Sequence, residues 1–272
     1  NNFDPITIET LSFIEQVSDF NGYLDDPSNL LDFGDIIASS AAMTAIAESS
    51  TAMSAVAASS TAMTAIAASS TAMSAIAASS TAMSAVAASS TAMSAIAESS
   101  TAMTAILANS TARALFIAST AIPISNTAKM TSDSTPAPFV SRASSQLNTD
   151  YAAWKAFNQG TLSDGFWSPA SNSSGNYIAY DFNVPVLVHT FEIYQSSSTY
   201  FAKSYVIEFS DDDINWSIAA TVVNSTYDTG SVIRTIPVNE AARHRYWRMR
   251  ITSANNSTYE TFLYLANFKG FK

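Results

Sequence analysis

The sequence of 272 residues contains no cysteine, so no disulfide can stabilise its fold. Charged residues make up only 12% of the chain, and 12 Lys and Arg stand against 22 Asp and Glu. A net charge of −10 without a basic stretch argues against binding to DNA or RNA, which requires a positive face. The chain also lacks any run of about 18 apolar residues, so it predicts no membrane span.

The acidic charge is concentrated at the start of the chain. Residues 1–40 carry eight acids and no base, whereas residues 121–272 nearly balance twelve acids with eleven bases. We expect residues 1–40 to form an acidic segment that either caps the first repeat of residues 41–120 or docks on another protein. Its apolar pattern predicts a short strand at residues 6–8, an amphipathic helix over residues 10–20, and a further turn that begins at Asp26.

Residues 41–120 contain neither glycine nor proline and repeat one ten-residue phrase, T-A-M-[ST]-A-[IV]-A-[AE]-S-S. Seven close copies are followed by a degenerate eighth from Thr111, a regularity that indicates a repeat architecture. We predict that the third and sixth residues of each copy pack together to form a shaft. These residues are Met43, Ile46, Met53, Val56, Met63, Ile66, Met73, Ile76, Met83, Val86, Met93, Ile96, Met103 and Ile106.

The conformation of the repeat follows from its period of ten. Alanine favours a helix, but ten residues at about 100° each fall roughly 80° short of three turns, so the Met stripe would circle an unbroken helix. Strands would keep Met on one face, although alanine is depleted in strands, and a disordered linker would not need regular Met. We favour short helical units that break at Ser-Ser-Thr, where a hydroxyl caps the next unit, stacked as a solenoid or around a symmetry axis.

One such unit cannot be stable alone. Burying one Met and one Ile contributes about 3–6 kcal/mol, whereas ordering the backbone of ten residues costs about 10–20 kcal/mol. Adjacent repeats or partner chains must therefore complete the core. We predict a homo-oligomer, with a trimer as the favoured state.

A change in composition marks the end of the repeat. Residues 121–139 contain Pro123, Pro136 and Pro138 among Ser and Thr, which predicts a linker. From residue 140 the apolar period becomes two, and strand-like segments at 177–182, 186–194, 205–209, 217–223, 231–236 and 246–251 predict an antiparallel β sandwich over residues 140–272. In the last segment Trp247, Met249 and Ile251 share one face, while Arg248 and Arg250 lie on the other.

Five stretches of this region, in order, carry a resemblance to a known family. They are AFNQGTLSDGFWSP (156–169), YIAYDFNVPVLVHTFEIY (177–194), SYVIEFSDDDINWSIA (204–219), AARHRYWRMRI (241–251) and LANFKGF (265–271). Residues 140–272 resemble the discoidin, or factor V/VIII C-type, domain, which is a galactose-binding-like jelly roll. The resemblance implies ligand binding by loops at one end of the barrel, often to sugars and sometimes to lipid or protein.

The resemblance does not extend to a metal site. The family often has an Asp-Gly pair after Ala-Phe near a calcium-binding loop, but this chain has Asn158-Gln159-Gly160. The acidic run 210–216 offers calcium a second place, yet we favour a polar turn between strands, with Trp216 returning to the core. We therefore predict no cofactor and no metal.

Sugar recognition combines an aromatic platform with planar hydrogen-bonding groups. We assign Trp167 to the core. The candidate ligand-binding residues in loops are Trp154, Tyr200, Phe201, Tyr227, Asn224, His244, Asn255, Asn256 and Tyr259. The two histidines, His189 and His244, show no metal spacing, and no phosphate loop or nucleophile elbow is present, so we predict no enzyme activity.

The order of acidic end, repetitive shaft, joint and terminal binding domain is similar to phage tail fibres. We therefore hypothesise a trimeric virion attachment protein, located in a tail or fibre, whose C-terminal domain binds a host-surface glycan. Its N-terminal segment would bind another virion protein. The alternatives are a bacterial surface adhesin, a binding module detached from a polysaccharide-degrading enzyme, and a structural virion protein whose sandwich docks another protein.

Overall fold

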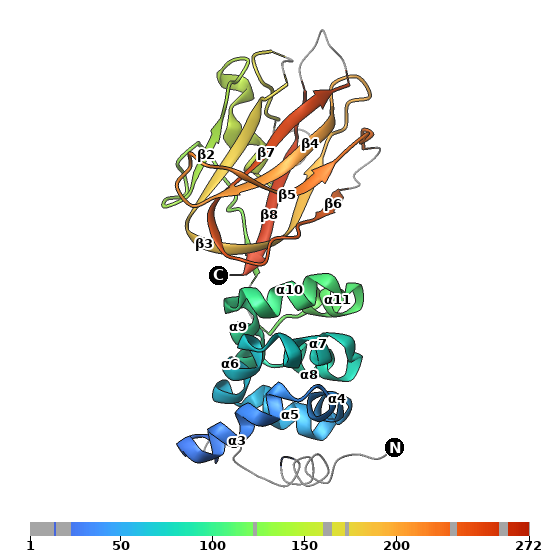
Figure 1. Cartoon of the computed structure of the whole chain (residues 1–272). Helices are drawn as coiled ribbons and strands as arrows, with labels where there is room; N and C mark the ends of the chain where they lie inside the picture. The colour runs from blue at the N-terminus through green and yellow to red at the C-terminus, as the bar shows by residue number, and fades with distance from the viewer. Residues whose placement is uncertain are drawn as a thin grey trace. The chain divides into compact units, whose positions relative to one another are not determined.

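The structure is a computed structural model that describes residues 14, 23–121, 124–159, 165–171, 174–228, 233–255 and 261–271 (Figure 1). It divides into two compact units, Asn1–Pro123 and Ile124–Lys272, which we call the helical unit and the β unit. The strand predicted at residues 6–8 lies outside the described residues. So does the helix predicted at residues 10–20, apart from Ile14, which is buried.

In the described part of the helical unit, the carboxylate of Asp26 accepts a hydrogen bond of 2.8 Å from the backbone N–H of Ser28. This cap starts a helix at the turn predicted there. That helix is α3 (Pro27–Ala38), which precedes the repeat. Each ten-residue copy then forms one nine-residue helix, as predicted. These helices are α4 (Ser40–Glu48), α5 (Ser50–Ala58), α6 (Ser60–Ala68), α7 (Ser70–Ala78), α8 (Ser80–Ala88), α9 (Ser90–Glu98), α10 (Ser100–Ala108) and α11 (Ser110–Ala118).

A single residue separates consecutive helices. It is the ninth residue of each copy, which we call the junction residue, and in Ser49 to Ser99 its φ lies between −87° and −107° and its ψ between 112° and 119°. This extended conformation ends one helix, and the hydroxyl of the same serine accepts a hydrogen bond from the third residue of the next. Helices joined in this way are bent by 101°, as between α5 and α6. The predicted break at Ser-Ser-Thr is therefore confirmed.

Because the chain turns sharply at every junction, each helix returns to pack on the helix three places along the chain, so that α4 contacts α7 and α5 contacts α8. One coil of this solenoid thus takes 30 residues. Junction serines also link the coils, because the hydroxyl of Ser79 donates to the carbonyl of Ala47 at 2.7 Å and that of Ser89 to Ala57 at 2.5 Å. These carbonyls lie in the last turn of a helix, where no helical N–H can reach them.

The interior of the solenoid is closed by one chain. Every Met and every Ile or Val predicted to pack in the shaft is at most 1% exposed, as are the alanines that precede the methionines from Ala52 to Ala102. Neighbouring repeats therefore complete the core, and the packing needs no second chain. The oligomeric state stays a prediction.

The last two copies differ from the others at their seventh residue, in the part of the repeat where stacking ends. The seventh residue is alanine in the copies that receive a further coil, as at Ala47, whose carbonyl accepts Ser79. No later helix of the described repeat stacks on α9, α10 or α11, and the seventh residues there are Ala97, which is buried, and Leu107 and Ile117, which are partly exposed. The larger side chains thus occur only where a neighbouring coil does not exclude them.

Among its described residues the β unit has eight strands, and every pairing between them is antiparallel. The strands are β1 (Ile124–Asn126), β2 (Val140–Ala143), β3 (Tyr177–Tyr194), β4 (Ala202–Ser210), β5 (Ser217–Val222), β6 (Arg234–Pro237), β7 (His244–Ala254) and β8 (Leu265–Phe271). Strand β3 spans two of the predicted segments. Its first half pairs with β2 and β7 and its second half with β8 and β6, with a register shift between Asp181 and Val186.

The residues predicted as a linker are largely part of the β unit. Strand β1 pairs with β8, the hydroxyl of Thr127 donates to Asn267 at 2.7 Å, and Met130 is fully buried in the core. The division between the units lies between Pro123 and Ile124, at the start of the predicted linker rather than at its end. Proline content alone did not reveal these long-range contacts.

Strand β7 follows the predicted alternation. Trp247, Met249 and Ile251 are at most 2% exposed, while Arg248 and Arg250 lie on the outer face and both bind the carboxylate of Glu208 at 2.6 Å. Trp216, which the sequence assigned to the core, is only half-buried. Its ring lies 4.0 Å from the guanidinium of Arg248, so a cation stacked on the outer face holds this large aromatic side chain there.

Within the described ranges, no single helix is long and apolar enough to cross a membrane, although three bent pairs of consecutive helices pass on length and composition.

The double role of the junction hydroxyl predicts a sharp difference between two serines. Ser89 caps α9 and bonds the preceding coil, whereas the hydroxyl of Ser84 only donates to the carbonyl of Ser80 in its own helix. We expect Ser89→Ala to lower the free energy of unfolding by about 2 kcal/mol, from one lost cap and one lost hydrogen bond. Ser84→Ala should change it by less than about 0.5 kcal/mol. Urea titration of the full chain, followed by far-UV circular dichroism, measures both, and equal effects would contradict the role of the junction.

The period of ten predicts which deletions the shaft accepts. Removal of residues 71–80 leaves every remaining helix opposite a helix with the same sequence pattern, so we expect a cooperative thermal transition with proportionally less helix. Removal of residues 71–75 shifts the Met and Ile positions of one helix away from its neighbours. We expect that variant to lose the sharp transition, and a melting curve like that of the ten-residue deletion would show that register does not matter.

Candidate ligand-binding site

The strand register assigns the loops of the β unit to two opposite ends. At one end β3 finishes at Tyr194, β4 begins at Ala202, β7 finishes at Ala254 and β8 begins at Leu265, and we call this the aromatic end. At the other end His244 pairs with Val186, and Phe271 pairs with Leu187. Strand β7 separates the two ends by roughly 30 Å, given a rise of about 3.3 Å per residue.

A continuous row of rings lies at the aromatic end. Phe166 is 4.9 Å from Tyr151 and 4.4 Å from Phe262, measured between ring centroids, and Phe262 is 4.6 Å from Tyr200. We call these four residues the aromatic row. All four are half-buried, so part of each ring is held by its neighbours and part faces solvent. Tyr264 extends the row sideways at 4.8 Å from Phe166.

The backbone explains why these rings meet. Trp167 and Leu263 form a two-way bridge, with N–H to carbonyl distances of 2.9 and 3.0 Å, and both side chains are fully buried. Because side chains alternate along an extended chain, Phe166 and Phe262 then point away from the core. The N–H of Phe262 donates to the carbonyl of Tyr200 at 2.9 Å, which brings the fourth ring into the row.

Sequence reasoning found only Tyr200 of the aromatic row. Tyr151, Phe166 and Phe262 were missed although each directly follows a polar run, because the sequence does not reveal that these three distant segments meet. A signal was available in the sequence. Trp167, already assigned to the core, lies next to Phe166, and in Phe262-Leu263-Tyr264 an aliphatic residue lies between two aromatic residues. Assigning Trp167 and Leu263 inward would have turned their neighbours outward.

Several predicted residues do lie at the aromatic end. Tyr227 is 39% exposed, and its ring centroid lies 6.1 Å from that of Phe201. Phe201 is buried, so it packs behind the surface and does not face a ligand. Asn255 is exposed, and its N–H donates to the carbonyl of Phe201 at 3.0 Å. Asn224 is exposed in a left-handed conformation with φ of 52°, and its N–H donates to Ser204 at 3.3 Å. Asn256 and Tyr259 lie outside the described residues.

Two predicted residues lie elsewhere. His244 is at the opposite end, buried and stacked on Phe209 with centroids 3.9 Å apart, so it cannot join the aromatic row. Burial lowers the pKa of His244, but Glu240 and Asp211 outweigh this and raise it above its ordinary value. Trp154 lies in the 3-10 helix Ala153–Phe157. Its backbone N–H donates to the carboxylate of Asp133 at 3.1 Å, and the ammonium of Lys155 lies 5.6 Å from the centroid of its ring.

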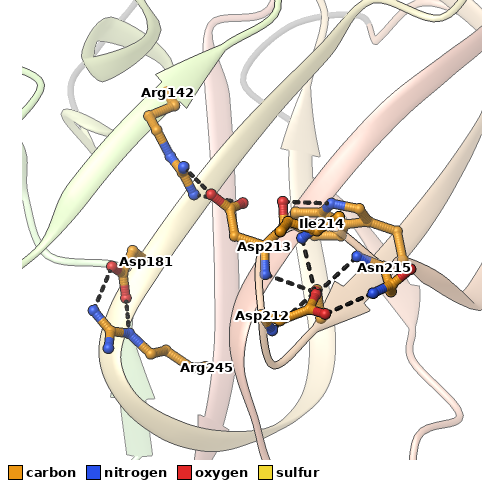
Figure 2. A network of polar contacts seen from close by, with 9 residues as sticks. Arg142, Asp181, Asp212, Asp213, Ile214, Asn215 and Arg245 are labelled. Carbon is orange, nitrogen blue, oxygen red and sulfur yellow. Dashed lines mark hydrogen bonds and ion pairs between the residues drawn. The ribbon is translucent and has the colours of Figure 1, made fainter.

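The acidic run 210–216 forms a turn in which each aspartate has its own partner. Asp212 accepts the N–H groups of Ile214 and Asn215 at 2.9 and 2.8 Å, which lowers its pKa, while Arg142 holds Asp213 (Figure 2). Asp211 faces His244 at 3.0 Å. This geometry supports the polar turn. In the part of the chain that the structure describes, no group of three or more His, Asp or Glu side chains could hold a metal ion.

The aromatic end has the chemistry of a site for an uncharged, hydroxyl-rich ligand. Its row is composed of Tyr and Phe, its exposed amides come from Asn224 and Asn255, and none of these groups is charged at neutral pH. Aromatic faces bind apolar CH surfaces, and planar amides both donate and accept hydrogen bonds. A pyranose ring offers both kinds of surface.

One family model and several solved structures are similar to the β unit. Residues 141–263 match the model of the F5/8 type C domain. A mutant of chitosan-binding module 1 from a Paenibacillus sp. IK-5 chitosanase/glucanase is 24% identical, with a TM-score of 0.41, over 49% of this chain and 95% of that one. The family 32 carbohydrate-binding module from Clostridium perfringens NanJ, solved with galactose, is 12% identical, with a TM-score of 0.39, over 48% and 93%.

An F5/8 type C domain from Bacteroides fragilis is 13% identical, with a TM-score of 0.41, over 50% of this chain and 93% of that one. No curated protein matches the chain. The match of residues 141–263 to the family model confirms the resemblance predicted from the sequence. Residues 141–263 form an antiparallel β domain of the discoidin, or F5/8 type C, family.

Proposed function

We propose that the aromatic end of the β unit binds a neutral glycan and that the helical unit is a shaft for its display. The observation that carries this proposal is the aromatic row on a discoidin-type domain, since four touching and half-exposed rings offer a platform larger than one side chain. The uncharged Asn224 and Asn255 supply hydrogen bonds beside it. The role that we propose for this row is ligand binding, through the faces of its rings.

We extend this proposal to an attachment protein of a virion tail or fibre. The support is the organisation of the chain, in which a self-contained repeat solenoid precedes a binding domain and most of the net negative charge lies in residues 1–40. Because each coil of the solenoid makes the same contacts with its neighbours, coils can be added or removed without a change in those contacts. The acidic segment would then dock on another virion protein.

The glycan proposal predicts the effect of removing one ring of the row. We expect Tyr200→Ala to weaken binding at least tenfold, which corresponds to about 1.4 kcal/mol, because the platform loses one of its faces. Trp216→Ala is the matched control, since that half-buried ring lies on the outer face of the sheet, under Arg248. The full chain is screened on an array of neutral and acidic glycans, and calorimetric titration with the strongest ligand follows. Wild-type protein without any glycan signal would refute the proposal.

Display on a shaft also motivates the predicted trimer. Single sugar sites bind weakly, and several linked copies raise the overall affinity by orders of magnitude. We expect light scattering at micromolar concentration to give three times the chain mass of 28.9 kDa. Since the core closes within one chain, a folded monomer would contradict the trimer while leaving the solenoid intact.

A further inference from the structure

We propose that Arg234 acts as a positioning residue that clamps two loops of the aromatic end and thereby sets the geometry of the ligand site. The first loop joins β3 to β4 and carries Tyr200, and the second follows β5 and carries Asn224 and Tyr227. The inference rests on the proposed glycan function for its ligand, but its structural part is independent of that function.

Arg234 reaches the second loop from strand β6 through several donors. One terminal nitrogen of its guanidinium bonds the carbonyl of Thr226 at 2.7 Å and a carboxylate oxygen of Asp228 at 2.6 Å. The other terminal nitrogen bonds the hydroxyl of Ser225. Three residues of one loop are thus fixed by one planar group, which a lysine with its single ammonium could not reproduce.

Asp228 passes this restraint to the first loop. Its second carboxylate oxygen accepts the N–H of Gln195 at 2.9 Å, and its own N–H donates to the carbonyl of Gln195 at 2.7 Å. The side-chain oxygen of Gln195 in turn accepts the N–H of Ala202 at 2.7 Å, which closes the loop that carries Tyr200. The chain of contacts therefore runs from Arg234 to both ends of that loop.

The groups of the clamp are shielded from water, which strengthens their hydrogen bonds and ion pair. Gln195 is fully buried, and the side chain of Asp228 is only 4% exposed. Burial raises the pKa of Asp228 above its usual range, although Gln195 and Arg234 act in the opposite direction. Burial also raises the pKa of the neighbouring Tyr205 to about 12, so the phenol beneath the clamp stays neutral. Removal of Arg234 would leave a buried carboxylate unpaired, a costly arrangement that the loops would relieve by moving.

The same region of the sequence offers a control with similar chemistry. Arg245 forms two bonds of 2.8 and 2.9 Å with Asp181, an ion pair of the same type near the opposite end of the β unit (Figure 2). Arg245→Ala removes one guanidinium and leaves one carboxylate unpaired, as Arg234→Ala does. The two variants therefore differ in the place where the ion pair is lost and in the further bonds of Arg234 to Ser225 and Thr226, which are part of the clamp.

The test has two readouts on the full chain. Hydrogen exchange should become at least tenfold faster at the amides of Gln195, Ala202 and Asp228 in Arg234→Ala and remain unchanged there in Arg245→Ala. Affinity for the strongest neutral glycan of the array should fall about tenfold in Arg234→Ala and stay within twofold in Arg245→Ala. Arg234→Lys should give intermediate values, and it supplies the same two measurements if Arg234→Ala does not fold.

The outcomes separate the clamp from the glycan proposal. Unchanged exchange at all three amides in the Arg234 variants would overturn the clamp, whatever the protein binds. Faster exchange with unchanged affinity would overturn its role in positioning the ligand. A wild-type protein that binds no glycan would refute the proposed function and with it the positioning role, while the exchange data would still decide whether Arg234 orders the loops.

Discussion

The helical unit depends on one backbone position, the extended junction residue between consecutive helices. At Ser59, φ of −90° and ψ of 117° end one helix, and the hydroxyl then caps the next through the N–H of Ala62 at 3.1 Å. In later copies the same hydroxyl group also donates to a carbonyl one coil earlier. Because one hydroxyl satisfies groups at two helix ends, the chain turns every ten residues without glycine or proline. This regular turn directs the Met and the Ile or Val of each of the seven close copies into the core.

The shaft shows which part of a repeat fold is encoded locally. The mismatch between a period of ten and the helical turn was enough to predict a break, and Ser-Ser-Thr was enough to locate it. The number of helices in a coil was not predictable, because it depends on the bend of 101° at the junction, which the period of ten does not contain. For the same reason the sequence left open whether neighbouring repeats or partner chains close the core.

The β unit shows where local pattern fails. Alternation placed Trp247 and Met249 correctly, because burial of one face decides the register of a strand. It misplaced Trp216, since a cation stacked outside the sheet gives a large ring a favourable position there. It also grouped His244 with Asn255, although β7 carries them to opposite ends. Which loops share an end follows from strand pairing between distant segments, and a single sequence does not reveal this pairing.

The pattern of charge constrains how the aromatic end can recognise a ligand. Acids and bases nearly balance in residues 121–272, and many are already paired, as in Glu208 with Arg248 and Arg250 or Lys269 with Glu192. A domain neutralised in this way exerts little long-range attraction on a charged ligand. Selectivity must then come from short-range contacts, namely ring faces and amides held at fixed separations. Such contacts fall off steeply with distance, so the rigidity of the loops matters more here than their charge. The ion pair between Arg234 and the buried Asp228, which is bonded to both loops, meets that requirement.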